Sequence, residues 1–144
     1  MLTGAESDEP QVVDGQQRLA TTMILIAAIR DYLTTNDFQT KGDEVSRQYL
    51  ATRDLRSDEL LPRLRLNSVD NEFFVNRIIT PPEDRAEKEP VLESHRRIDK
   101  AAQLAKTRVK TIAVSAGAKA VDSLIDWVDF INRKAKVIRV RRRS

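Results

Sequence analysis

Apolar residues recur at helical spacing over three long segments of the chain. The first, Gln16 to about Leu33, is apolar nearly all round in its middle turns, which predicts a central buried helix. The second begins near Leu92 and carries a face of small residues, which lets another helix approach closely. After a break at Ser115 to Gly117, an apolar stripe from Val121 to Ile131 predicts a third helix. We therefore expect the central helix to pack against the two later helices.

Short β-prone runs predict a few strands around these helices. Residues 11–13 and 137–140 predict one strand near each end of the chain, and residues 45–66 predict two weak strands. A short amphipathic helix is predicted from Val69 to Ile79, where Thr80-Pro81-Pro82 ends it because proline cannot continue the hydrogen-bond ladder. The fold class expected from this order is α+β and predominantly α.

The same pattern predicts a flexible lead followed by one partial domain. A strand at either end of the chain needs a neighbour with which to pair. We therefore expect the chain to be an internal piece of a larger protein, with exposed edges through which it could oligomerise. The expected parts are a lead at 1–9 and a domain at 10–144, comprising a strand and helix at 10–35, short strands at 45–66, a helical part at 67–134 and a basic terminal strand at 135–144.

Composition narrows the chemistry more than the fold. Only 5% of the 144 residues are aromatic, so the core is expected to be mostly aliphatic. The absence of Cys excludes disulfides and thiolate chemistry, and a single His disfavours a metal site, so none is predicted. The longest uncharged apolar stretch, Leu19 to Ile29, is about half the ~20 residues that a membrane span needs. No secretory signal is seen either, and we expect a soluble, cytoplasmic protein.

Charge is distributed unevenly along the chain. The segment from Arg133 to Ser144 holds seven basic residues and no acidic one, while the other 132 residues carry 18 basic and 22 acidic groups. A local cluster of this kind can contact DNA phosphate without reading sequence, or can keep an exposed strand soluble. Both interpretations stay open, and the candidate DNA-binding residues are Arg139, Arg141, Arg142 and Arg143.

A polar motif stands where the first predicted strand meets the central helix. Asp14 can cap the helix, and Gly15 allows a tight turn and a close approach of a ligand to the backbone. The unpaired N–H groups of a first helical turn favour an anion. Gln16 and Gln17 add amide groups, and the guanidinium of Arg18 matches phosphate. The motif thus predicts a phosphate or nucleotide site, although an ordinary helix cap with no ligand explains the same residues.

Three segments of the sequence resemble one known family. They are Val-Asp-Gly-Gln-Gln-Arg-Leu at 13–19 with Thr21 and Thr22 behind it, Arg-Leu-Asn-Ser-Val-Asp-Asn-Glu-Phe-Phe at 65–74, and Glu-Ser-His-Arg-Arg-Ile at 93–98. In this order they are similar to the signature of the N-terminal domain of GmrSD-type restriction endonucleases. That family has a ParB/sulfiredoxin-like fold and belongs to bacterial phage-defence systems.

The resemblance implies a fragment of a ParB/sulfiredoxin-like domain with a helical subdomain and short edge strands. It further implies a module that binds and hydrolyses a nucleoside triphosphate of the GTP or ATP class, with or without Mg²⁺, for a modification-dependent restriction system. Asp14 would then be the acid of the site, Arg18 a catalytic contact, and Gly15, Gln16 and Gln17 further nucleotide contacts.

The family also implies a partner for cleaving DNA. Its members work with an HNH-type nuclease domain or subunit, and this chain carries no such motif, so a fragment alone is expected to be weakly active or inactive. The competing interpretation is a non-enzymatic helical interaction module or a DNA-binding module.

Three further groups of residues have a chemical and a structural interpretation. Asp122, Asp126 and Asp129 could bind a divalent cation, but a solvated helix face explains their spacing more simply. His95 could act as an acid or base, but it also fits a polar residue near a helix start. Residues 70–72 could join the nucleotide site, although capping of the following helix needs no further assumption.

Overall fold

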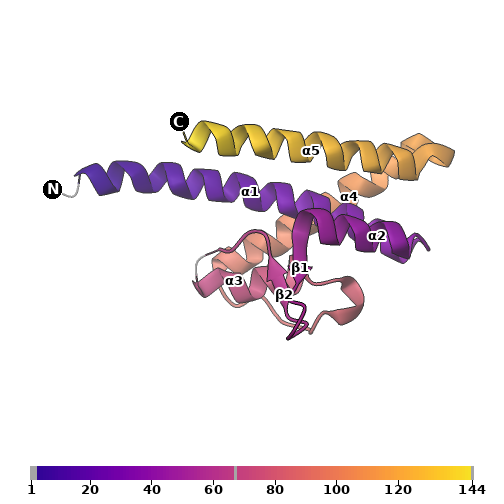
Figure 1. Cartoon of the computed structure of the whole chain (residues 1–144), viewed down its shortest axis with the longest axis horizontal. Helices are drawn as coiled ribbons and strands as arrows, with labels where there is room; N and C mark the ends of the chain where they lie inside the picture. The colour runs from indigo at the N-terminus through magenta and orange to yellow at the C-terminus, as the bar shows by residue number, and fades with distance from the viewer. Residues whose placement is uncertain (1–2, 67, 144) are drawn as a thin grey trace.

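The computed structural model describes the backbone of residues 3–66 and 68–143 and the side chains of residues 17–66 and 69–134. Three long helices dominate it, and a two-stranded hairpin with short helical turns fills the chain between the first and the second (Figure 1). The elements are α1 (Thr3–Thr35), α2 (Gln39–Val45), the π-helical turn η1 (Ser46–Leu50), β1 (Ala51–Arg53), β2 (Leu60–Pro62), α3 (Ser68–Phe74), the π-helical turn η2 (Val75–Ile79), the 3₁₀ turn η3 (Pro82–Asp84), α4 (Glu93–Ala116), the 3₁₀ turn η4 (Gly117–Lys119) and α5 (Ala120–Arg143).

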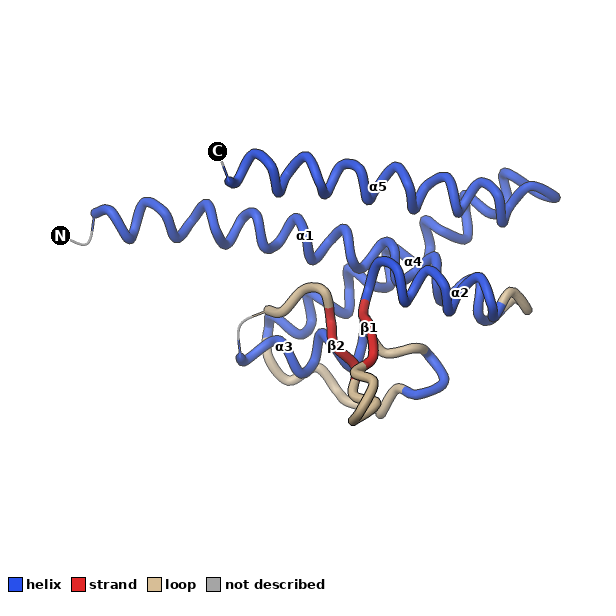
Figure 2. The backbone as a smooth tube through the Cα atoms, in the orientation of Figure 1, coloured by secondary structure: helices blue, strands red, loops and turns tan. Residues whose placement is uncertain are grey.

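Helix α1 is the centre of the molecule, as its apolar pattern predicts. It contacts α2, α4 and α5, and its residues from Leu19 to Leu33 supply much of the buried cluster. Helix α5 runs antiparallel along one side of α1, while α3 and the hairpin lie on the other side (Figures 1 and 2). The predominantly helical α+β class is therefore confirmed.

The core is mostly aliphatic, as the scarcity of aromatic residues predicts. Helix α4 buries the small face expected of it, because Ala102, Ala105, Val109 and Ala113 all face inward. The break before α5 is also confirmed. Gly117 has φ +57°, a conformation that L side chains rarely adopt, and it lets the chain reverse from α4 into α5.

The predicted strands at the two ends of the chain are wrong. Residues 11–13 belong to α1, and so do residues 3–9, for which a flexible lead was expected; residues 137–140 belong to α5. A short β-prone run with no partner strand leaves its peptide groups unpaired, whereas a helix pairs them within the segment. Local β-propensity is weak enough for helix continuation and packing to override it.

The middle of the chain contains two short strands, and both lie within residues 45–66, the segment that predicts two weak strands. Strands β1 and β2 pair antiparallel, with Ala51 opposite Pro62 and Arg53 opposite Leu60. Residues 45–50 are helical, and residues 64–66 follow the second strand as a loop. The amphipathic helix predicted from Val69 to Ile79 is observed as α3 followed by η2.

Gly42 allows α2 to lie against the end of α1. It is buried, and a Cβ built there would overlap Thr34 Oγ1 and lie 3.2 Å from the carbonyl oxygen of Arg30. We expect Gly42→Ala to lower the free energy of unfolding by about 1–3 kcal/mol, the usual range for overpacking. This reverses the sign of intrinsic propensity, which favours Ala over Gly in a helix by about 1 kcal/mol.

Urea unfolding followed by circular dichroism measures the effect of this substitution. Thr40→Ala, at an exposed position of the same helix, is the matched control and should stabilise slightly. A Gly42→Ala variant more stable than the wild type would show that α2 does not contact α1 as closely as the structure has it.

Candidate functional site

The motif Asp14 to Arg18 lies inside α1, which changes how it could bind a ligand. Helix α1 begins at Thr3, so residues 15–18 lie in its interior and not in a first turn. Backbone N–H groups in a helix interior are already bonded to carbonyls four residues earlier. The predicted tight turn with unpaired amides is therefore wrong, and any ligand at this motif would be held by side chains.

The described part of the motif is accessible. Gln17 and Arg18 are exposed, and burial along α1 begins with the next residue, Leu19. The hydroxyls of Thr21 and Thr22 donate to the carbonyl oxygens of Gln17 and Arg18, at 3.0 and 2.9 Å. The side chains of Asp14 and Gln16 and the surroundings of Gly15 lie outside what the structure describes, so the assignment of these three as site residues stays a prediction.

The arginine-rich end of α5 lies toward the same end of the molecule as the motif. Because α1 and α5 are in contact and antiparallel, the last turns of α5 run beside the N-terminal half of α1 (Figures 1 and 2). The backbone of residues 139–143 is helical instead of extended. The side chains of the four candidate DNA-binding residues, Arg139, Arg141, Arg142 and Arg143, lie outside the described residues.

A pocket of about 460 Å³ opens elsewhere, between α1, α4 and the chain from η2 to Arg85. Ile24, the lining residue of α1 that is nearest in sequence to the motif, is six residues beyond Arg18, which is about 9 Å along a helix at ~1.5 Å per residue. The pocket and the motif are thus separate features of the same helix. The sequence did not predict the pocket, because its walls come from segments that are far apart along the chain.

A buried arginine, Arg30, contacts two residues that line this pocket, Asp31 and Ile78. Arg30 is 1% exposed, and its Nη1 and Nη2 donate to the carbonyl oxygens of Ile79 and Ile78, both at 2.6 Å. These carbonyls belong to the last residues of η2, where a helical segment leaves acceptors without intrahelical partners. Arg30 of α1 therefore caps the C-terminal end of η2 and holds η2 against α1.

Asp31 extends this contact into a network of charges. Its Oδ1 accepts from Arg30 Nε at 2.9 Å, and its Oδ2 accepts from Arg85 Nη2 at 2.8 Å. Arg85 Nε also donates to the carbonyl oxygen of Thr80 at 3.1 Å. Burial lowers the pKa of the Arg30 guanidinium, and the neighbouring Asp31 opposes that shift. One carboxylate is thus shared by two guanidinium groups at the edge of the pocket.

Two of the remaining candidates lie together, because His95 Nε2 is 3.7 Å from Asp70 Oδ1 where the start of α4 meets α3. His95 stacks on Phe73 with ring centroids 4.6 Å apart, and it lies in the first turn of α4, near the helix start expected for it. Asn71 accepts a hydrogen bond from the backbone N–H of Leu66, and Asp70 accepts one from the Ser94 hydroxyl at 2.5 Å. Glu72 forms an ion pair with Lys88.

The acidic face of α5 is exposed. Asp122, Asp126 and Asp129 all reach solvent, and Asp129 accepts a hydrogen bond from the Tyr49 hydroxyl at 3.2 Å. Among the residues whose side chains are described, no group of three His, Cys, Asp or Glu side chains is arranged to hold a metal ion. Within the same part of the chain, no helix is long and apolar enough to cross a membrane.

Comparison of the chain with family models, with curated proteins and with solved structures gives no match. Functional inference therefore depends on the residues of this chain and on the resemblance carried by its motifs.

Proposed function

We propose that this chain is a nucleotide-binding and hydrolysing module of a modification-dependent restriction system, part of a ParB/sulfiredoxin-like domain. Arg18 and Gln17 contact the phosphates of a nucleoside triphosphate of the GTP or ATP class, and Asp14 supplies the acid. DNA is contacted by the arginines near the end of α5 and is cut by an HNH-type nuclease domain or subunit.

The observation that carries the proposal is the neighbourhood of two polar segments at one end of the α1–α5 pair. Gln17 and Arg18 are exposed there, and the arginine-rich turns of α5 lie beside the same half of α1. A guanidinium is well matched to phosphate oxygens and keeps its charge at all physiological pH values. A cluster of such groups favours a polyphosphate or a nucleic-acid backbone over a neutral ligand.

The test is nucleotide affinity in the wild type and in Arg18→Ala. Fluorescent GTP and ATP analogues are titrated with the folded chain, and binding is followed by fluorescence anisotropy. We expect Arg18→Ala to weaken binding by about 10- to 100-fold, because a hydrogen bond to a charged group contributes about 1.5–3 kcal/mol.

Arg108→Ala is the matched control, because Arg108 is an exposed arginine on α4 that does not line the pocket. It should leave the affinity unchanged, and circular dichroism should show all three proteins equally helical. Equal affinities for wild type and Arg18→Ala, or no binding by a folded wild type, would overturn the assignment and favour a non-enzymatic helical module.

A further inference from the structure

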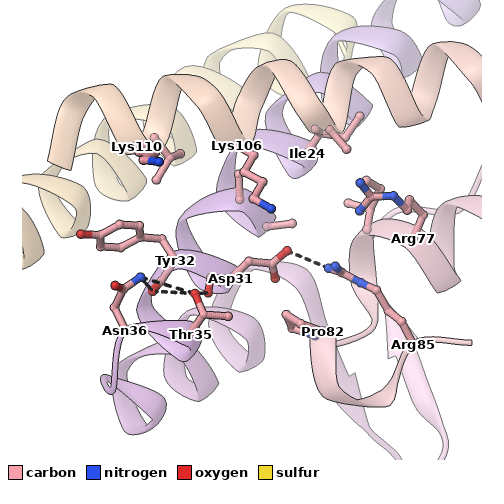
Figure 3. A pocket seen from close by; sticks show the side chains of 15 residues that line it. Ile24, Asp31, Tyr32, Thr35, Asn36, Arg77, Pro82, Arg85, Lys106 and Lys110 are labelled. Atoms are coloured by element: carbon pink, nitrogen blue, oxygen red, sulfur yellow. Dashed lines mark hydrogen bonds and ion pairs between the residues drawn. The ribbon is translucent and has the colours of Figure 1, made fainter. Parts of the chain in front are cut away.

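The pocket between α1 and α4 carries more positive charges than carboxylates that could pair with them. Its lining includes Arg77, Arg85, Lys106 and Lys110, and it includes one carboxylate, that of Asp31. Figure 3 shows the nitrogens of Lys106, Arg77 and Arg85 directed into the same space, although these residues come from three different segments.

The ion pairs around the pocket leave cations in excess. Arg77 Nε lies 2.9 Å from Asp99 Oδ1, and Asp31 is shared between Arg30 and Arg85. Lys106 and Lys110 make no hydrogen bond or ion pair with the described residues. The cations in and beside the pocket are Arg30, Arg77, Arg85, Lys106 and Lys110. The carboxylates are Asp31, Asp99 and Glu83, whose charge acts on Arg30. Five cations therefore stand against three carboxylates, and the two lysines of α4 are the groups in excess.

The rest of the lining includes apolar residues. They are Ile24, Ala27 and Ala28 of α1 and Ala102 and Val109 of α4. A volume of about 460 Å³ lies in the range of small-molecule sites, which combine an apolar surface with a few convergent polar groups. This combination suits a ligand with one strongly anionic end and an apolar body.

The cationic wall is also held in place before any ligand arrives. Arg85 is fixed by Asp31 and by the Thr80 carbonyl, and Arg77 is fixed by Asp99. Both arginines are less than one-third exposed, so neither has much conformational freedom to lose on binding. Planar guanidinium groups match the geometry of phosphate and carboxylate oxygens alike. The two further cations, Lys106 and Lys110, favour a doubly charged phosphate over a singly charged carboxylate.

We propose that this pocket is a second ligand site, distinct from the motif on α1, and that it binds the phosphate group of a small organic phosphomonoester. The phosphate lies among Arg77, Arg85 and Lys106, with Lys110 at the rim. The apolar part of the ligand contacts the alanine-rich floor between α1 and α4. No step of the proposed nucleotide chemistry depends on this site.

The test uses phenyl phosphate, inorganic phosphate and phenol as probes of the two halves of the site. Each is titrated at low ionic strength, and backbone amide shifts are followed by NMR. We expect phenyl phosphate to bind at least tenfold more tightly than either fragment and to shift amides of residues 27–36 and 102–110. Added salt should weaken the binding, because the attraction is electrostatic.

The decisive variant is Lys106→Gln/Lys110→Gln, which removes the two lysines without breaking an ion pair. We expect its affinity for phenyl phosphate to fall by about tenfold, because each substitution removes one charged contact with the phosphate dianion. The control Lys100→Gln/Lys119→Gln makes the same charge change at exposed positions outside the pocket.

Three results would overturn the proposal. One is no binding of phenyl phosphate at millimolar concentration, another is an equal loss in the two double variants, and the third is equal affinity for phenol. Arg18→Ala should leave phenyl phosphate binding intact, so failure here is distinguishable from failure of the nucleotide site.

Discussion

Replacing Arg30 by methionine is expected to destabilise the protein by about 3–5 kcal/mol, the range for breaking a buried charged contact from one side. Methionine is similar in length and is a good helix former, so α1 itself should persist. What is lost is the pair of donors to the carbonyl oxygens of Ile78 and Ile79, which are buried and would be left unpaired.

The loss should appear in urea unfolding followed by far-UV circular dichroism. Arg30→Lys separates charge from geometry, because an ammonium is a point charge and cannot reproduce the planar fork that reaches two carbonyls and Asp31 together. We expect it to be less stable than the wild type and more stable than Arg30→Met.

Arg108→Met is the matched control, since Arg108 is an exposed arginine in the interior of α4, and its effect should stay within about 0.5 kcal/mol. If Arg30→Met were as stable as this control, the contact between α1 and the end of η2 would contribute little to the fold.

The long helices are predictable from the sequence because they depend on periodicity, which repeats over many residues. The buried face of α1, the alanine face of α4 and the break at Gly117 all follow from that pattern. The end strands fail for the opposite reason. A run of three or four residues with two or three β-branched side chains carries little information until a partner strand is known, and in α1 and α5 no partner pairs with it.

The buried arginine beside the pocket could be predicted from the sequence only in part. Arg30 follows Ile26 by four residues and precedes Leu33 by three, which is the spacing of the buried face. That position predicts a buried guanidinium in need of partners. Its partners lie 48 and 49 residues further along the chain, so only the folded structure could identify them.

The motif on α1 shows a different limit. Its residue types indicate a phosphate ligand, and the resemblance indicates the same, but the proposed mechanism depended on where the helix begins. A helix that starts eleven residues before Asp14 removes the backbone amides from consideration and leaves the side chains as the binding groups. Residue identity could be interpreted from the sequence, whereas the helix boundary could not.

Replacing Phe74 by alanine is the second change with a large expected effect. Phe74 is the last residue of α3, is fully buried, and belongs to the same apolar cluster as Leu33 and Leu50. Removing its ring takes away the transfer free energy and leaves a cavity, so we expect a loss of about 3–5 kcal/mol in urea unfolding.

Phe130→Ala makes the same chemical change at a position that is 44% exposed. It should lower stability by about 1 kcal/mol, because it removes only an edge contact with Trp127 and a contact with Lys134. Equal losses for the two variants would mean that α3 is not anchored to the central helix through this ring.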